Sequence, residues 1–378
     1  MKQNIFQNER VPALGMGCMR LPVVEGDNSV IDEAATERLI ARAMEQGITY
    51  FDTAWGYHGG NSERVMGRLL KAYPRESFLL ATKFPGYSRD ALSKKEETFQ
   101  TQLDKCQTEY FDFYLLHNVS ETNVDQYLDE QYGLVPYLLE EKRRGRIRHL
   151  GFSSHGTIAT LERFLRETGE AMEFCQIQLN FLDWELQNAA GKVAFLNRKG
   201  LPVWVMEPLR GGRLLKLDEQ QQTILKAANE HHSLPEWAFR YVKGVEGVTV
   251  TLSGMGTEQE ILENSRIFSD EATLTETEQT AVQAVTRSLL QADLVPCTAC
   301  CYCLENCPKG LQIPWLLELY NEQKYGKREQ YAPYAMAAVA EEKKPTACIG
   351  CCACERACPQ GIPIAAILHE IAQGLKNA

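Results

Sequence analysis

The chain has 378 residues, enough for one large domain and a smaller one, and its hydrophobic share of 44% is ordinary for a globular protein. Its net charge of −10 argues against a nucleic-acid-binding surface, and no apolar run is long enough for a membrane span. The polar start, broken by Pro12 and Pro22, is unlike a signal peptide, so the 13 cysteines predict metal binding in a cytoplasmic protein rather than disulfides.

Residues 1–290 alternate between short apolar runs and amphipathic helical patterns. The helical pattern of 32–46 repeats apolar residues every four positions, and Ser62 is expected to cap the next helix. The apolar runs predict eight strands, at 13–19, 48–54, 78–84, 111–117, 147–153, 174–180, 202–208 and 248–253. Eight βα units in about 250 residues predict an α/β fold, a TIM (β/α)8 barrel.

A doubly wound sheet is the competing architecture. A dinucleotide-binding sheet of that kind carries Gly-x-Gly-x-x-Gly after an early strand. The segment Gly15-Met16-Gly17-Cys18-Met19-Arg20 lacks the third glycine, so this fingerprint is not met.

Four ionisable side chains stand where predicted strands end: Asp52, Tyr57, Lys83 and His117. In a TIM barrel these ends share one mouth, where catalytic groups gather. A lysine ammonium close to Tyr57 would lower the phenol pKa from its usual value of about 10. Asp52 would keep Lys83 charged, and His117 would hydrogen-bond a carbonyl oxygen. Each residue alone has a structural explanation, as a cap, a packed ring or a strand end; together they favour proton delivery to an oxygen as hydride reaches the carbon.

The C-terminal part, 291–378, carries the same cysteine pattern twice. Cys297-x-x-Cys300-x-x-Cys303-x-x-x-Cys307-Pro308 returns as Cys348-x-x-Cys351-x-x-Cys354-x-x-x-Cys358-Pro359. This is the bacterial ferredoxin spacing, in which the fourth cysteine of each run serves the other cluster. One 4Fe–4S cluster is therefore assigned to Cys297, Cys300, Cys303 and Cys358, and a second to Cys348, Cys351, Cys354 and Cys307. Structural zinc is the alternative, but it would leave the third and fourth cysteines of each run without a role.

The segment between the two runs is longer than a compact β-type ferredoxin needs. Residues 274–291 predict a helix that closes the barrel, and 314–322 and 333–342 predict two helices within the cluster module. We therefore expect a barrel over 1–290 and a small, mainly α-helical, dicluster ferredoxin-like domain over 291–378.

With these residues in view, the sequence resembles the aldo-keto reductases. The resemblance is carried by Phe51-Asp52-Thr53-Ala54 with Tyr57, then Ser62-Glu63 and Gly67, then Thr82-Lys83, then His117, in which the order and spacing of the Asp, Tyr, Lys and His match that family's tetrad. Met206–Gly212 and the cysteine-rich tail are similar to its iron–sulfur branch. The resemblance implies a TIM barrel, an extended nicotinamide cofactor across its mouth, and hydride transfer at a carbonyl with Tyr57 as general acid/base.

The resemblance also implies cofactor contacts. Ser153 and Gln176 match the family's carboxamide contacts, whereas Ser154 stands where asparagine is usual and Met206 where an aromatic ring stacks on nicotinamide. Glu260 stands where a basic residue often holds the 2′-phosphate, which disfavours strict NADPH use. The implied contacts are Gly17, Cys18, Ser153, Ser154, Gln176, Met206, Pro208, Leu209, Gly211, Ser253, Gly254, Thr257 and Asn264. NAD(H) and NADP(H) both remain candidates, with a flavin as the alternative.

Two classes of function follow. The first is an oxidoreductase that acts on a small-molecule carbonyl or alcohol and is coupled to, or accompanied by, two clusters. A hydride carries two electrons and a cluster passes one. A flavin would therefore have to divide the pair, or the clusters exchange electrons with something else, or they are structural. The alternative is an electron-transfer protein that relays single electrons between a redox partner protein and a barrel-bound cofactor. A sensor with an inactive barrel fits an intact tetrad less well, and no nucleic-acid or membrane partner is expected.

Overall fold

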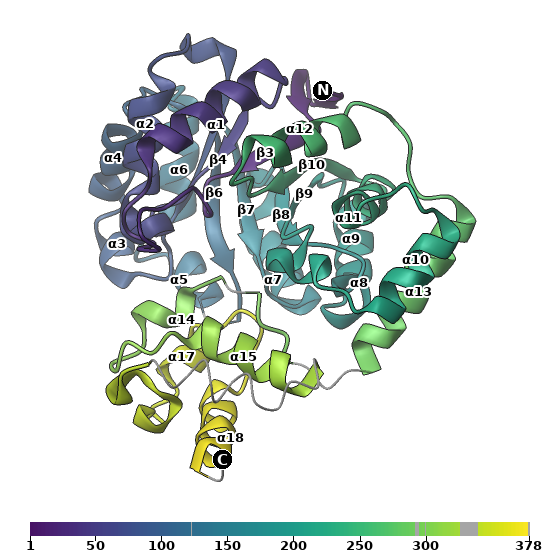
Figure 1. The fold of residues 1–378 in the computed structure, drawn as a ribbon. Coiled ribbons are helices and arrows are strands. Elements are labelled where there is room, and N and C mark those ends of the chain that lie inside the picture. The colour runs from purple at the N-terminus through teal and green to yellow at the C-terminus, as the bar shows by residue number, and fades with distance from the viewer. Residues whose placement is uncertain (122, 292–294, 299, 326–338, 377–378) are drawn as a thin grey trace. The chain divides into compact units, whose positions relative to one another are not determined.

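The computed structural model describes residues 1–121, 123–291, 295–298, 300–325 and 339–376 (Figure 1). The chain divides into two compact units. The barrel unit contains Met1–Leu209 and Thr223–Val282, and the cluster unit contains Arg210–Gln222 and Gln283–Ala378. The cluster unit therefore includes one short segment, Arg210–Gln222, that interrupts the barrel unit in the sequence.

Eight parallel strands form a closed barrel in the order β10-β3-β4-β5-β6-β7-β8-β9. Each falls within, or nearly coincides with, a predicted apolar run, so the TIM-barrel prediction is confirmed. The strands are β3 (Leu14–Gly17), β4 (Tyr50–Asp52), β5 (Leu79–Phe84), β6 (Phe111–Val119), β7 (Ile147–Ser154), β8 (Cys175–Gln178), β9 (Val203–Met206) and β10 (Val248–Ser253).

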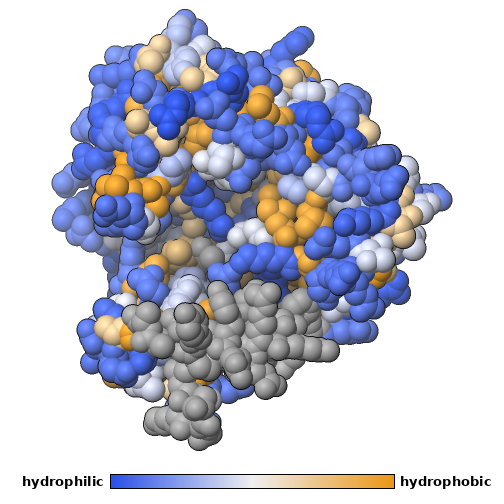
Figure 2. All heavy atoms as spheres, viewed as in Figure 1, coloured by the Kyte–Doolittle hydropathy of each residue, from blue (hydrophilic) through white to orange (hydrophobic). Residues whose placement is uncertain are grey.

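Helices connect successive strands and cover the outside of the barrel, where their apolar faces bury a shared core. They are α1 (Glu33–Glu45), α2 (Ser62–Leu70), α3 (Arg89–Ser93), α4 (Lys95–Cys106), α5 (Val124–Leu128), α6 (Leu134–Arg143), α7 (Ile158–Thr168), α8 (Asp183–Leu186), α9 (Ala189–Arg198), α10 (Glu219–Ala228), α11 (Leu234–Lys243) and α12 (Glu258–Ile267). Figure 2 shows a mostly hydrophilic face with apolar side chains in separate patches. Among the described residues, no helix combines the length and apolarity that a membrane crossing requires.

The predicted cap at Ser62 is wrong. Asn61 precedes α2, and Ser62 is the first residue within the helix. The Ser62 hydroxyl donates to the carbonyl oxygen of Cys18 at 2.9 Å and lies 2.8 Å from the Thr53 hydroxyl. Ser62 is fully buried, so its hydroxyl ties the start of α2 to the rim of the barrel rather than closing a helix end.

An N-terminal hairpin, which the sequence analysis did not predict, precedes the barrel. Strands β1 (Gln3–Phe6) and β2 (Glu9–Pro12) pair antiparallel. Phe6 and Val11 enter the inner core of the barrel, where the Phe6 ring lies 4.9 Å from Trp204 and 5.7 Å from Phe113, measured between centroids. The hairpin therefore fills the barrel interior with aromatic side chains instead of standing apart as a polar arm.

The cluster unit has a different architecture, and its described residues contain helices and turns but no strand. It comprises the second part of α13 (Glu276–Gln291), then α14 (Tyr302–Glu305), α15 (Ile313–Tyr325), α17 (Ala353–Arg356) and α18 (Ile364–Lys376). The helices expected at 274–291 and 314–322 are confirmed. The helix expected at 333–342 lies mostly outside the described residues.

The two cysteine runs share their backbone conformation as well as their spacing. Cys301 and Cys352, each directly after the second motif cysteine, have φ of 64° and 54° and precede the short helices α14 and α17. Gly310 and Gly361, three residues after each fourth cysteine, have φ of 57° and 61°. The duplication seen in the cysteines therefore extends to the turns that present them.

Gly67 lies where α2 packs closely against α4. A Cβ at Gly67 would lie 2.4 Å from the carbonyl oxygen of Lys105, a backbone atom that cannot swing aside. Gly67→Ala should therefore lower the free energy of unfolding of the barrel unit by about 1–3 kcal/mol, measured by urea denaturation. Gly244→Ala is the control, because Gly244 has φ of −81° and only ordinary contacts around an added Cβ. Equal unfolding midpoints for the two variants would contradict this account.

Candidate active site and cluster sites

The carboxyl ends of three neighbouring strands bring the four predicted catalytic residues to one rim. Asp52 ends β4, Lys83 lies near the end of β5, and His117 lies near the end of β6. Tyr57 begins the short turn of 57–60 that follows β4. Since parallel strands all end on the same side of the barrel, side chains far apart in sequence meet there.

Lys83 is the centre of this group. It is completely buried, and its Nζ donates to Asp52 Oδ1 at 2.5 Å, to the carbonyl oxygen of Thr53 at 2.8 Å and to the Tyr57 hydroxyl oxygen at 3.2 Å. All three ammonium hydrogens therefore have an acceptor, as burial of a cation requires. Because the phenol oxygen accepts from Lys83, its own hydrogen is left to donate toward a substrate.

The pKa of Tyr57 moves in the direction opposite to the prediction. Burial of the hydroxyl raises it well above 10 even though part of the ring reaches solvent, and the negative charge of Asp52 raises it further. The contact with Lys83 does not reverse these two effects. The phenol consequently holds its proton at neutral pH, and the expected lowering by Lys83 is wrong.

His117 faces Tyr57 edge-on, with ring centroids 6.0 Å apart and planes at 82°. Burial, followed by the charges of Lys83 and His155, lowers the pKa of His117 well below 6.5. The imidazole is therefore neutral, so it can hydrogen-bond a carbonyl oxygen without carrying a charge. Tyr87, which sequence reasoning missed, is a third aromatic here, with its ring 5.8 Å from His117.

A buried network holds the end of β5 in place; the sequence motif included Glu63 and Thr82, but sequence reasoning missed Gln102 and Lys105. Glu63, in α2, accepts hydrogen bonds from Thr82 Oγ1 at 2.7 Å, Gln102 Nε2 at 2.6 Å and Lys105 Nζ at 3.2 Å. Gln102 also lies within 3.0 Å of the Lys83 carbonyl oxygen. The network connects α2 and α4 to the strand that carries Lys83, and so fixes where the ammonium can reach.

The loop that carries Tyr57 is held by its neighbour His58, another residue not singled out from the sequence. His58 adopts φ of 54°, an uncommon conformation for a non-glycine residue. Its Nε2 accepts the backbone N–H of Leu21 at 3.1 Å, and its Nδ1 lies 2.8 Å from the Asn28 carbonyl oxygen. Because Nε2 is the acceptor, Nδ1 carries the hydrogen, and the ring is fixed as one neutral tautomer.

Among the implied cofactor contacts, the structure brings Gln176 and Met206 together, with Gln176 Nε2 3.7 Å from Met206 Sδ. The other amide atom, Gln176 Oε1, is buried and has no hydrogen-bond partner among the described residues. Ser153 and Ser154 lie on β7, and their hydroxyls bond to the backbone of Asn118 and Val119. A buried acceptor left open at this rim fits an amide donor such as a nicotinamide carboxamide.

A second set of implied contacts lies at the start of α12. Asn264 Nδ2 is 3.4 Å from Ser253 Oγ, and Thr257 caps the helix. Glu260, however, completes a capping box, because its Oε2 accepts the N–H groups of Gly256 at 2.7 Å and Thr257 at 3.2 Å. The amides at this helix start, which could otherwise receive a phosphate, are therefore already bonded to a carboxylate of the chain.

The remaining implied contacts lie in three places. Gly17 ends β3, and the buried Cys18 follows it, its N–H donating to the Asp52 carbonyl oxygen at 2.8 Å. Pro208 and Leu209 follow β9 in the barrel unit, whereas Gly211 belongs to the cluster unit. Gly254 follows β10, and a Cβ there would lie 3.3 Å from that of Arg20.

The second predicted cluster site is a cavity. Its lining includes all four assigned cysteines, namely Cys307, Cys348, Cys351 and Cys354, together with Leu311 and other apolar residues. The backbone N–H of Leu311 donates to Cys307 Sγ at 3.4 Å. Three thiols of one run and one thiol of the other therefore share a mostly apolar cavity, the donor set that a 4Fe–4S cluster takes.

At the first predicted site, Cys303 is buried, and Cys297 and Cys358 lie close to it. Burial first, then the charges of Cys297, Cys301 and Cys358, raises the pKa of Cys303. Cys300, half-buried, lies three residues earlier on the same run. Within the described ranges, no three His, Cys, Asp or Glu side chains converge as they would on a single metal ion.

Comparison with known proteins gives two family matches. The model of the aldo/keto reductase family matches residues 13–287, and that of the 4Fe–4S dicluster domain matches residues 289–359. L-galactose dehydrogenase of Arabidopsis thaliana is 26% identical over 309 residues, which cover 76% of this chain and 92% of that protein. A probable aldo-keto reductase of Glycine max is 34% identical over 155 residues, 39% of this chain and 42% of that one.

Solved structures agree with the barrel. The holo form of an aldo-keto reductase from Bacillus halodurans has a TM-score of 0.62 at 24% identity, covering 75% of this chain and 96% of that one. An aldo/keto reductase from Klebsiella pneumoniae in complex with NADP and acetate has a TM-score of 0.59 at 20% identity, covering 74% and 93%. At these identities the likeness shows the fold. Together with the family match over residues 13–287, it shows that the chain belongs to the aldo/keto reductase family and carries a 4Fe–4S dicluster domain C-terminal to its barrel.

Proposed function

We propose that the protein is a nicotinamide-linked oxidoreductase that interconverts a small-molecule carbonyl compound and its alcohol, with Tyr57 as the acid/base. The observation that carries the proposal is the buried Lys83, which hydrogen-bonds both the Asp52 carboxylate and the Tyr57 hydroxyl. A bound reduced nicotinamide would supply the hydride to the carbonyl carbon. Tyr57 gives its proton to the carbonyl oxygen, and the neutral His117 orients that oxygen.

The raised pKa of Tyr57 favours the reducing direction. A phenol that keeps its proton at neutral pH is ready to protonate the oxygen that becomes negative as the hydride arrives. In the oxidising direction the same phenol would first have to lose that proton, which burial and Asp52 both disfavour. Tyr57 is therefore proposed to act as the proton donor when the carbonyl is reduced.

A nicotinamide is a better candidate than a flavin for the barrel cofactor. The support is the open acceptor Gln176 Oε1, which matches the carboxamide of a nicotinamide. The carboxylate of Glu260 at the start of α12 favours NADH over NADPH, since it repels a 2′-phosphate and holds the amides of Gly256 and Thr257. The structure of the cofactor pocket thus supports NADH as the preferred donor.

The cluster unit is proposed to hold two 4Fe–4S clusters. Cys297, Cys300, Cys303 and Cys358 would hold one, and the four cysteines that line the second cavity would hold the other. Such clusters pass single electrons, so the natural counterpart is a redox partner protein that exchanges one electron at a time.

Tyr57→Phe should abolish most of the carbonyl reduction. The variant keeps the ring but removes the proton donor, so kcat should fall by about 100- to 10,000-fold while the Kd for NADH stays within about twofold. Steady-state assays over a panel of aldehydes and ketones measure kcat, and fluorescence titration measures the Kd for NADH. Tyr73→Phe, which removes a hydroxyl directly after α2, serves as the control. Full turnover by Tyr57→Phe would exclude the assigned role.

Glu260→Ala should shift cofactor preference toward NADPH. Removing the carboxylate frees the amides of Gly256 and Thr257 and removes a like charge, so the affinity for NADPH should rise about tenfold relative to NADH. The lost capping box should cost about 1 kcal/mol of stability. Glu258→Ala is the matched control, because it removes a carboxylate from the same turn that pairs instead with Arg42. An unchanged ratio of the two Kd values in Glu260→Ala would contradict the interpretation.

The cysteine assignment can be tested with adjacent pairs. Cys300→Ala and Cys351→Ala each remove one assigned ligand, so anaerobically purified protein should lose about four of about eight iron atoms per chain. Cys301→Ala and Cys352→Ala remove neighbouring thiols that lie outside the motif and should keep the full iron content. Iron analysis with visible absorption measures both. The ligand assignment would be refuted if Cys301→Ala lost as much iron as Cys300→Ala, and Cys352→Ala as much as Cys351→Ala.

A further inference from the structure

Strand β6 has one residue more than β7 directly after His117. The register between the two strands shifts between Leu116 and Val119, so His117 and Asn118 both stand opposite Ser153 of β7. The two flanking residues belong to the core beneath the helices, so the extra residue lies with His117 at the rim. A β-bulge of this kind is common next to active sites, because it redirects a side chain.

The backbone of this bulge is firmly held, but it does not explain the side chain of Asn118. The Asn118 N–H donates to Ser153 Oγ, and its carbonyl oxygen accepts from Asn123 Nδ2, both at 2.8 Å. Its φ of 55° suits asparagine or glycine. Its Oδ1 is buried, yet it has no hydrogen-bond partner within the described ranges. A glycine would meet the backbone requirement without burying an open polar atom, so the amide needs another explanation.

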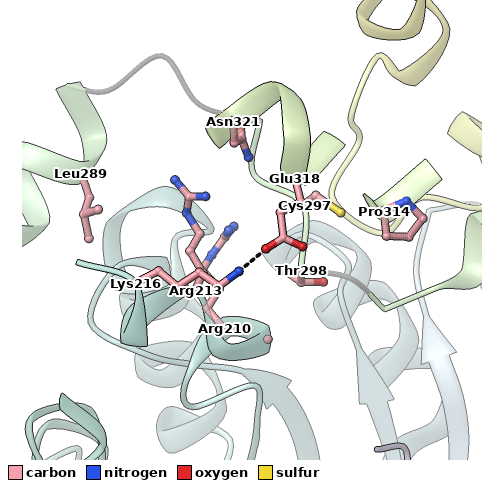
Figure 3. Close-up of a pocket in the computed structure, with 10 residues that line it drawn as sticks. Arg210, Arg213, Lys216, Leu289, Cys297, Thr298, Pro314, Glu318 and Asn321 are labelled. Atoms are coloured by element: carbon pink, nitrogen blue, oxygen red, sulfur yellow. Dashed lines mark hydrogen bonds and ion pairs between the residues drawn. The ribbon is translucent and has the colours of Figure 1, made fainter. Parts of the chain in front are cut away.

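A structural asparagine of the same chain differs from Asn118. Asn321 lines a pocket of the cluster unit, shown in Figure 3. Its side chain accepts the N–H of Val295 and donates to the Val295 carbonyl oxygen, both at 2.8 Å. Both ends of that amide are used within the fold. The open Oδ1 of Asn118 instead fits a group that serves a ligand.

A second open amide oxygen lies on the other side of Ser153. Gln176 of β8 pairs with Ser153 in the sheet, and its Oε1 is likewise buried and without a partner among the described residues. Ser153 Oγ accepts the Asn118 N–H and makes no other hydrogen bond in the part of the chain that the structure describes, so its own hydrogen can be donated. Three neighbouring strands, about 4.8 Å apart, therefore offer two acceptors with one donor between them.

This set complements a primary carboxamide, whose –NH2 group has two hydrogens to donate and whose carbonyl oxygen is an acceptor. We propose that Asn118 is a cofactor-binding residue that, together with Gln176 and Ser153, holds the carboxamide of NADH. The inference rests on the proposed nicotinamide cofactor, and it adds a contact that the family resemblance did not imply. A substrate hydroxyl is the alternative partner for Asn118, but it would leave Gln176 Oε1 open.

Calorimetric titration of the anaerobically purified holoprotein with NADH, and with its reduced 3-acetylpyridine analogue, tests the proposal. The analogue carries a methyl group in place of the carboxamide –NH2, so it cannot donate to either amide oxygen. Asn118→Gly keeps the backbone conformation and removes Oδ1, so the Kd for NADH should rise about three- to tenfold. The Kd for the analogue should stay within about twofold. Gln176→Met should give the same pattern.

Two further variants separate recognition from a structural effect. Asn118→Asp tolerates a positive φ and keeps an acceptor oxygen, so it should recover most of the NADH affinity that Asn118→Gly loses. Gln126→Met is the matched control. Gln126 Oε1 is also buried and lacks a partner among the described residues, but it belongs to α5 and lies outside this set, so the Kd for NADH should stay within about twofold. Circular dichroism and iron content verify that each variant is folded and loaded.

Three results would overturn the role of Asn118: an unchanged Kd for NADH in Asn118→Gly, an equal loss of affinity for NADH and for the analogue, or no recovery in Asn118→Asp. An unchanged Kd together with a higher KM for carbonyl substrates would assign Asn118 to the substrate instead. Failure of the proposed function is seen separately. A wild type that shows no saturable NADH binding contradicts the cofactor itself, whereas discrimination between NADH and the analogue through Gln176 alone contradicts only the role of Asn118.

Discussion

The barrel's candidate site depends on one buried ion pair. Lys83 is a buried cation. Its burial is tolerated only because Asp52, the Thr53 carbonyl oxygen and Tyr57 accept its three ammonium hydrogens. Burial raises the pKa of Asp52, and the nearby Lys83 opposes that rise, so the charge of Asp52 depends on Lys83. Removing either one would leave an uncompensated charge in the barrel wall, and the geometry around Tyr57 would be lost together with its chemistry.

The rest of the rim is arranged around that pair. Glu63 and Gln102 hold β5, the strand that carries Lys83. His58 holds the loop that carries Tyr57 through hydrogen bonds with Leu21 and Asn28. None of these residues points at a reacting atom. They determine instead where the Lys83 ammonium and the Tyr57 phenol lie, so the geometry of the tetrad in this chain depends on buried polar side chains outside it.

The parts that sequence could predict were those set by periodicity or spacing. The eight strands follow from alternating apolar runs, and the meeting of Asp52, Lys83 and His117 follows from strand ends alone. The pKa of Tyr57 was predicted with the wrong sign, because it depends on how deeply the hydroxyl is buried, which no local pattern reveals. The hairpin was missed because its strands, Gln3–Phe6 and Glu9–Pro12, each begin with two polar residues and so form no continuous apolar run. The capping role of Glu260 was also missed, although it could have been predicted, because Thr257 and Glu260 have the spacing of a capping box.

Each proposed cluster site takes one cysteine from the other run, and this arrangement affects how the cluster unit can assemble. Cys307 belongs to the first run by sequence yet lines the cavity of the second, and Cys358 of the second run lies close to Cys303 of the first. Each half therefore contributes a side chain that the other half cannot replace. A chain that stopped between the two runs would lack three donors at one site and one at the other, so neither site would be complete. On the proposed ligand assignment, neither cluster can be completed during synthesis until Cys358 has left the ribosome.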